Sequence, residues 1–186
     1  MNTSRRPGLE LIRGRRTVSL FKRGKPPREL MLAAVEAARW APNHHLTEPW
    51  RFYILGRETV RAMTGIAEEI TRAKRGAEAA GRRRELMESV PAWMAVTCRR
   101  SEDAFRERED YAACCCAVQN LMLCLWEGGV ACKWSTGALT RDARFYGLLG
   151  ADVAEQMVVG LFSMGYPQVV PQQKRRPAEE ILTELA

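Results

Sequence analysis

Residues 111–134 read YAACCCAVQNLMLCLWEGGVACKW. Residues 111–127 form the most hydrophobic predicted helix of the chain, and apolar side chains occupy nearly every face of it. A helix that is apolar nearly all round lies at the centre of a core or in a subunit interface. Gly128 and Gly129 are expected to end this helix, and residues 130–134 to form a strand.

Outward from this stretch, helical and extended segments alternate. Apolar spacing and terminal Pro and Gly residues predict helices over 9–15, 28–40, 57–88 and 141–149, and a helix at 178–185 in the tail. Gly76 and Gly81 interrupt residues 57–88, which therefore form one broken helix or two. Strands are predicted at 50–55, 92–98, 130–134 and 156–163. This order indicates helices layered on a sheet, in a single domain of residues 1–186 whose first eight residues are flexible.

The composition is that of a globular domain. The chain has 186 residues, of which 46% are hydrophobic and 27% are charged, as in ordinary single-domain proteins. No apolar run approaches the ~18 residues of a membrane-spanning helix, and basic residues 1–16 lack the apolar core of a signal peptide. We therefore expect a cytoplasmic protein with no membrane partner.

The net charge of +7 is a feature of proteins that bind nucleic acid. The densest basic stretch, residues 72–84, is interrupted by Glu78 and contains no aromatic residue on which a base could stack. A solvated helix face is the favoured interpretation, and no nucleic-acid partner is expected. The same charge suits anionic small molecules.

The chain has six cysteines and two histidines. No two cysteines form a Cys-x-x-Cys pair, and three consecutive ones point to different faces of a helix. The histidines, His44 and His45, are adjacent, so the spacing does not favour a zinc site and no metal is expected. Most of the thiols are interpreted as small buried hydrophobic groups. The cysteines are Cys98, Cys114, Cys115, Cys116, Cys124 and Cys132.

Two segments in the first third of the chain suggest ligand binding. Arg15, Arg16 and Thr17 place two guanidiniums beside a hydroxyl, which favours binding of an anion such as phosphate. Residues 39–52, RWAPNHHLTEPWRF, take the chain from a helix through a polar loop into an aromatic strand. Loops between rigid elements often carry ligand contacts. His44 and His45 are either ring contacts, a general base or simply exposed loop residues.

A third segment follows the hydrophobic helix. Residues 128–138, GGVACKWSTGA, are glycine-rich but do not match the G-x-G-x-x-G fingerprint of dinucleotide-binding folds. Ser135, Thr136 and Gly137 form a short loop whose backbone amides can face a ligand. No G-x-S-x-G elbow is present to support a serine nucleophile.

Taken in order, these segments resemble the nitroreductase family, and in particular its short bacterial members, which also carry a histidine where His44 stands. The resemblance extends over residues 9–182. The matching motifs are Arg15-Arg16-Thr17, the Ala-Pro-(loop)-Pro-Trp-Arg-Phe segment, Gln119-Asn120, Gly-Gly-(four residues)-Trp-Ser-Thr-Gly, Gly165-Tyr166-Pro167, and Lys174-Arg175-Arg176-Pro177 followed by Glu179-Glu180.

The resemblance implies an α+β fold in three layers, with a mixed central sheet flanked by helices. It implies a homodimer in which the long hydrophobic helix lies in the interface and the tail, residues 169–186, embraces the partner. It also implies an enzyme that uses FMN. Such an enzyme passes reducing equivalents from NAD(P)H to a nitroaromatic, a quinone or a similar electrophile by a ping-pong mechanism.

The resemblance further implies which residues bind FMN. The basic turn and the tail hold the phosphate, ribityl chain or pyrimidine edge. The loop after the second helix approaches the flavin across the dimer, and the third strand and its loop line the isoalloxazine ring. These residues are Arg15, Arg16, Thr17 and Arg175; Trp40, Asn43 and His44; and Trp134, Ser135, Thr136 and Gly137. No acid–base pair is assigned, and His44 is the one candidate for a titrating catalytic group.

Three positions depart from the family pattern. Ser19 stands where many members have arginine, and Leu46 and Glu48 stand where many have asparagine and glutamine. These departures leave the pyrimidine contacts open. The alternatives are a specialised flavin enzyme, such as a dehalogenase or enoate-type reductase, and a non-catalytic flavin-binding protein. The sequence does not name the acceptor or separate NADH from NADPH.

Overall fold

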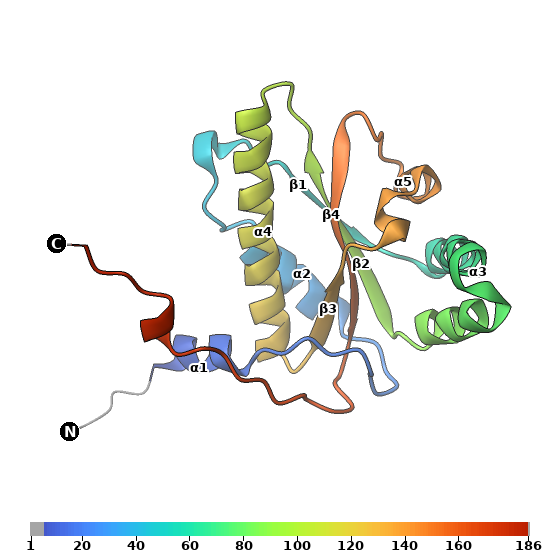
Figure 1. The fold of residues 1–186 in the computed structure, drawn as a ribbon, viewed down its shortest axis with the longest axis horizontal. Helices are drawn as coiled ribbons and strands as arrows, with labels where there is room; N and C mark the ends of the chain where they lie inside the picture. Colours follow the sequence, from blue (N-terminus) through green and yellow to red (C-terminus); the bar gives the residue numbers. More distant parts are fainter. Residues whose placement is uncertain (1–5, 186) are drawn as a thin grey trace.

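The computed structural model of the protein describes residues 6–185. Its centre is a four-stranded sheet in the order β1-β2-β4-β3 (Figure 1). Each pair of neighbouring strands is antiparallel, and a bulge between Val96 and Thr97 shifts the register of the central pair. The strands are β1 (Trp50–Ile54), β2 (Ala92–Arg99), β3 (Ala131–Ser135) and β4 (Gln156–Gly165).

Helices cover both faces of this sheet, which confirms the expected α+β arrangement in three layers (Figure 1). α2 (Arg28–Ala38) and α4 (Ala104–Glu127) pack on one face, and α3 (Arg57–Glu88) and α5 (Ala143–Leu149) pack on the other. β2 alternates between the two cores because successive side chains of a strand point to opposite faces. Met94 and Val96 join the α2–α4 core, whereas Trp93 and Ala95 join the α3–α5 core.

The expected mixed sheet needs a correction. Within residues 6–185, the parallel component is the isolated bridge between Thr17 and Cys132. The β1–β2 and β3–β4 connections each return the chain to the end of the sheet that it left, whereas α4 carries it back to the opposite end, so β2 and β3 both run antiparallel to β4, which lies between them. α3 makes the first of these returns: its backbone turns at Gly76, where φ is +80°, and the chain that leaves β1 at Leu55 re-enters beside it at Trp93, whose carbonyl oxygen accepts from the Leu55 amide at 3.0 Å.

α4 is longer than the hydrophobic pattern indicates. It begins at Ala104 rather than at residue 111, because the Asp103 side chain accepts hydrogen bonds from the amides of Phe105 and Arg106. Such a cap lets a helix start in a polar segment. Among the described residues, none of the helices combines the length and the apolarity needed to cross a bilayer.

The two ends of the chain also differ from expectation. α1 spans Pro7–Gly14, so the last residues of the predicted flexible segment are helical, and residues 1–5 lie outside the described part. The predicted helix at 178–185 is a single 3-10 turn, η3 (Ala178–Glu180). Residues 168–185 are all exposed, so no burial supports a longer helix there. The tail runs away from the sheet (Figure 1).

Candidate functional site

The basic turn lies against the third strand of the sheet. Thr17 pairs with Cys132 in β3, and Arg15 and Arg16, which precede it, are half-buried. Nη1 of Arg16 donates to backbone carbonyl oxygens at the C-terminal end of α1. The positive charge of Arg15 acts on β3, because it counteracts part of the rise in the pKa of the Cys132 thiol that burial causes. The bridge therefore brings the backbone of the basic turn next to β3.

Trp134 is fixed at the far end of β3 by its own packing. Its indole Nε1 donates to the carbonyl oxygen of Val159 at 2.9 Å, and its ring lies 5.7 Å from that of Phe162, measured between centroids. The indole also occupies the space above Gly160. In this structure Trp134 orients the strand end, and the residues that follow it, 135–137, carry the open loop.

Ser135 and Gly137 line a cavity of about 640 Å³ between α3, β3 and the 3-10 helix η2 (Ala138–Arg141), here called the α3 cavity. Its floor is apolar and includes Leu139 and Leu161. Five basic residues and no acidic residue line it. The basic residues are Lys74, Arg75, Arg82, Arg83 and Arg141.

The sequence interpretation of residues 72–84 as a solvated helix face fits five of the six basic residues there, which are exposed. Arg72 and Arg84 fit it, because they are exposed and form ion pairs. Arg83 instead is half-buried, and desolvation lowers the pKa of its guanidinium. The sequence contained one sign of this arrangement, a glycine at position 76 within the predicted helix. In the structure Gly76 has a positive φ, and the backbone of α3 turns there.

A much smaller cavity, of about 30 Å³, adjoins the same strand. Arg83, Lys133, Ser19 and Trp93 are among the residues that line it. The indole N–H of Trp93 is buried and has no hydrogen-bond partner within residues 6–185. A buried donor of this kind is normally satisfied by a polar ligand atom or an ordered water. Ser19, one of the three positions that depart from the family pattern, therefore lines this small cavity together with Arg83 of α3.

The loop of residues 43–48 is held by its own side chains. Nδ2 of Asn43 donates to Oγ1 of Thr47 at 3.0 Å, and Oδ1 of Asn43 accepts from the amide of Glu48 at 2.7 Å. Thr47 in turn donates to Asp110, a buried carboxylate of α4. His45, within the 3-10 turn η1 (His44–Leu46), has φ of 59°. Asn43 therefore shapes the loop, whatever else it binds.

The other two predicted residues of this region are exposed. Trp40 is 74% exposed, and its indole Nε1 donates to Oε1 of Glu36 at 2.9 Å. The ring of His44 lies 3.8 Å from that of His45, between centroids. Both side chains lie at the surface and leave room for another molecule to contact them.

The basic turn and this loop lie near opposite ends of α4. A Cβ atom on Gly14 would be 3.3 Å from the indole of Trp126, whereas Thr47 contacts Asp110. Asp110 and Trp126 are separated by about 24 Å of helix, at ~1.5 Å per residue. The structure thus brings Thr17 to Cys132, in the strand that leads to residues 134–137, but it does not bring the basic turn to Trp40, Asn43 or His44 of the same chain.

Arg175 lies in the extended tail. The start of the tail is anchored, because the amide of Lys22 donates to the carbonyl oxygen of Tyr166 at 2.8 Å and Phe21 pairs with Pro167. Arg175 itself is exposed. Within the described chain it is not brought to the other predicted residues.

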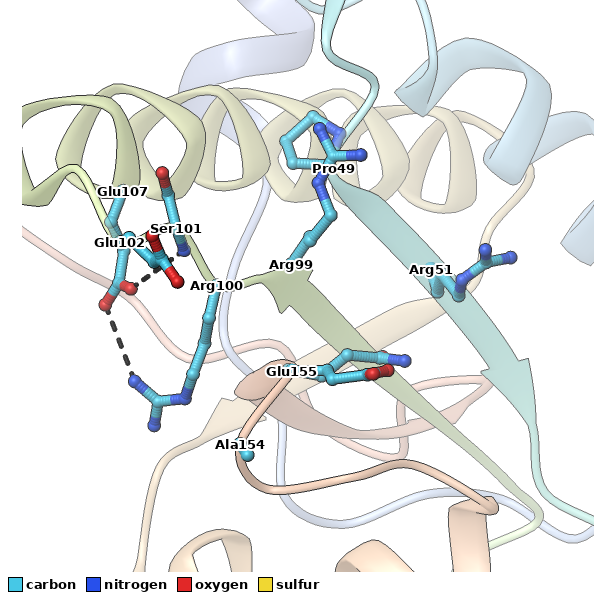
Figure 2. Close-up of a pocket in the computed structure, with 10 residues that line it drawn as sticks. Pro49, Arg51, Arg99, Arg100, Ser101, Glu102, Glu107, Ala154 and Glu155 are labelled. Carbon is cyan, nitrogen blue, oxygen red and sulfur yellow. Dashed lines mark hydrogen bonds and ion pairs between the residues drawn. The ribbon is translucent and has the colours of Figure 1, made fainter.

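A second cavity, of about 560 Å³, lies where β1, β2 and β4 meet the start of α4 (Figure 2). Arg100 and Glu107 face each other across it, with Nη1 and Oε1 3.5 Å apart, and Glu107 also accepts from the amide of Ser101. Three arginines and three glutamates line it, so its charges balance. None of the predicted site residues is among them.

The thiols follow expectation in part. Cys98, Cys114 and Cys132 are buried, whereas Cys116 is exposed on α4. Burial raises the pKa of Cys132 to about 12. In the described part of the chain, no group of three or more His, Cys, Asp or Glu residues is arranged to hold a metal ion.

Known proteins are similar to this chain over most of its length. Residues 12–166 match the sequence profile of the Nitroreductase family. YfhC of Bacillus subtilis, provisionally named an NAD(P)H nitroreductase, is 30% identical over 181 residues, which are 95% of this chain and 93% of YfhC.

Solved structures show the same fold. A nitroreductase-like family protein from Bacillus cereus is 30% identical, with a TM-score of 0.83 over 100% of this chain and 99% of that one. A protein from Desulfovibrio desulfuricans, solved in complex with FMN and provisionally described as a nitroreductase, is 22% identical. Its TM-score is 0.79 over 98% of this chain and 99% of that one.

Proposed function

The chain belongs to the nitroreductase family, and we propose that it is an FMN-dependent oxidoreductase that passes reducing equivalents from NAD(P)H to an electrophilic acceptor. Nitroaromatics and quinones are the acceptor classes proposed. The observation that carries this proposal is the pairing of Thr17 with Cys132, which sets the basic turn that contains Arg15 and Arg16 beside the strand that leads into the open loop 135–137.

The residues present fit FMN at both of its ends. At the phosphate end, the side chain of Arg15 is half-buried and forms no hydrogen bond within residues 6–185, so it is available to an anion. At the ring end, the unpartnered N–H of Trp93 lies by Lys133 and Ser19. Arginine and phosphate oxygens match in charge and geometry, and a ring carbonyl suits a free N–H.

When bound, FMN supplies two-electron exchange between NAD(P)H and the acceptor, in a ping-pong cycle. The chain orients the ring: Trp134 is fixed by its bond to Val159, which sets the direction of residues 135–137. Arg83 and Lys133, which line the small cavity beside Ser19, would supply positive charge near the bound ring. His44 is exposed and is the candidate catalytic residue.

A homodimer completes this site. Because the loop of residues 43–48 lies about 24 Å along α4 from the basic turn, we infer that the two regions contact the same FMN from different chains. A partner subunit supplies the loop, with Trp40, Asn43 and His44, and its tail supplies Arg175. The exposed apolar residues of α4, Phe105 and Tyr111, are covered in this arrangement.

The test is an absorption spectrum of the purified protein, before and after anaerobic NADH or NADPH. We expect the visible bands of oxidised flavin, and their bleaching by the donor. Reoxidation by menadione, a neutral quinone, completes the cycle. A colourless protein that neither binds nor reduces added FMN would overturn the proposal, and flavin that resists both donors would indicate a non-catalytic flavin-binding protein.

A further inference from the structure

The α3 cavity carries an excess of positive charge, of which the proposed function uses only Arg83. Five basic residues line it and no acidic residue does, and its floor includes Ile70, Leu86, Leu139 and Leu161. We propose that the α3 cavity binds an organic anion, an apolar body that bears a carboxylate or a phosphate, as a reactant of the flavin. This inference rests on the proposed function and names its substrate class.

Two arginines of α3 that lie outside the α3 cavity form ion pairs with glutamates of the same helix. Outside the cavity, Arg84 pairs with both Glu68 and Glu88, at 3.0 and 2.9 Å, and Arg72 pairs with Glu68 at 2.6 Å. Of the cavity cations, Arg82 pairs with Glu78.

The remaining four cavity cations lack such partners. Within residues 6–185, no ion pair is formed by Lys74, Arg75, Arg83 or Arg141. Like charges gathered in a concave, partly apolar site raise the local concentration of anions. The pairing pattern therefore points to an external anion as the missing partner.

The fold brings these cations together from three places. Lys74 and Arg75 precede the turn at Gly76, Arg83 follows it, and Arg141 ends η2. Both halves of α3 thus face the same cavity, and Figure 1 shows them folded back on each other. The ion pair of Arg144 with Glu69 ties α5 to α3 beside this cavity.

The position of the cavity connects it with the reaction. Ser135 and Gly137, which are assigned to the flavin ring, line it together with the cations. Its volume of about 640 Å³ falls within the ~300–1,000 Å³ of small-molecule sites. An apolar floor under a basic rim selects compounds that carry both an apolar body and a negative group. The second cavity, with its balanced charges, offers no such selection.

Two reactants could supply the anion: the 2′-phosphate of NADPH, or a carboxylate on the acceptor. The experiment compares the FMN-loaded wild-type protein with an Arg75→Gln/Arg141→Gln variant. Arg83 is left intact because it also lines the small cavity by Ser19. The matched control, Arg57→Gln/Arg61→Gln, removes the same charge from exposed positions on the same helix.

Three readouts are taken for each protein. Benzoate, with benzyl alcohol as its neutral counterpart, is titrated against the flavin absorption spectrum to give a dissociation constant without turnover. The ratio of kcat/KM for 4-nitrobenzoate to that for 4-nitrobenzyl alcohol reports on an acceptor carboxylate. The ratio of kcat/KM for NADPH to that for NADH reports on the 2′-phosphate.

We expect the anion to be favoured in the wild-type protein and in the control. In the Arg75→Gln/Arg141→Gln variant, the benzoate dissociation constant or an anion-to-neutral ratio should change by about tenfold or more, because charge-assisted hydrogen bonds are lost. A change in the benzoate and 4-nitrobenzoate readouts assigns the cavity to the acceptor, and a change in the NADPH ratio alone assigns it to the donor. If all three readouts equal those of the control, the inference is wrong.

Failure of this inference is distinct from failure of the proposed function. Bleaching of the wild-type protein by NADH and reoxidation by menadione involve no acceptor carboxylate and no 2′-phosphate. A protein that completes this cycle but shows no anion selectivity retains the proposed function and loses only the inference.

Discussion

At the scale of single residues, Gly160 shows how packing fixes the site. A Cβ atom at this position would overlap the indole of Trp134, whose Nε1 donates to the neighbouring carbonyl of Val159. The strand end that leads into residues 135–137 therefore depends on a missing side chain in β4.

We predict that Gly160→Ala destabilises the protein by about 1–3 kcal/mol, the usual cost of overpacking a core. The measurement is urea unfolding followed by circular dichroism. Gly147→Ala is the control, because a Cβ atom there meets nothing within 4 Å. Equal stability of the Gly160→Ala and wild-type proteins would show that Trp134 moves without cost.

A second residue-scale prediction concerns the phosphate. Arg16→Ala combined with Arg175→Ala should release FMN and leave the dimer folded, because the proposed contacts are to the ligand and not between subunits. The flavin-to-protein ratio after gel filtration measures the first effect, and the elution volume measures the second. Arg28→Ala with Arg57→Ala removes the same charge elsewhere. Full flavin retention in the first variant would contradict its assignment.

At the scale of elements, the start of α4 depends on one side chain. Asp103 accepts from the amide of Phe105 at 2.9 Å, and it satisfies donors that would otherwise lack partners in the first turn. We predict that Asp103→Ala costs about 1 kcal/mol of stability, measured by urea unfolding. Asp103→Asn keeps an acceptor and should retain most of the stability. A neutral Asp103→Ala substitution would mean that packing alone holds this turn.

The sequence predicted the helices and strands whose apolar residues recur with the period of a helix or a strand. The four strands and the hydrophobic part of α4 were found because their side chains enter a core. The first turns of α4 were missed, although Asp103 is a recognisable cap, because residues 106–110 are all charged. The tail helix was predicted from local preference and is absent beyond η3, where nothing is buried.

The candidate site was predicted less completely than the fold. Arg15, Arg16 and Thr17 could be joined to residues 134–137 through a family pattern, and the Thr17 bridge is consistent with this. The α3 cavity could not be predicted, because its cations come from both sides of Gly76 and from Arg141. Only the turn of the backbone at Gly76, with φ of +80°, brings them together.

At the scale of the whole molecule, exposed apolar side chains support the proposed dimer. Trp40 is 74% exposed and Leu46 is 83% exposed, and both belong to the region that the partner is proposed to use. Ala112 and Cys116 continue an exposed stripe along α4. Contiguous exposed apolar surface commonly marks an interaction site.

Mixed dimers test whether each site is shared between subunits. One chain carries Arg15→Ala/Arg16→Ala, the other carries Asn43→Ala, and two different tags allow the mixed dimer to be purified. If each FMN contacts the basic turn of one chain and the loop of the other, one site of two is intact. The mixed dimer should then bind about half of the wild-type FMN, whereas each parent homodimer binds little.

A site formed by a single chain would give a different flavin content in the mixed dimer. If both regions of one chain contacted the same FMN, every site of the mixed dimer would carry a defect, and its flavin content would match that of the parents. A wild-type dimer assembled from the two tagged chains is the control for purification.

The length of α4 between the basic turn and the loop also affects how the protein behaves on dilution. A lone subunit holds only one part of the proposed site, so dissociation of the dimer dismantles both sites at once. By mass action, added FMN should then lower the protein concentration at which the subunits separate. The yellow colour of a dilute solution would report assembly as well as cofactor content.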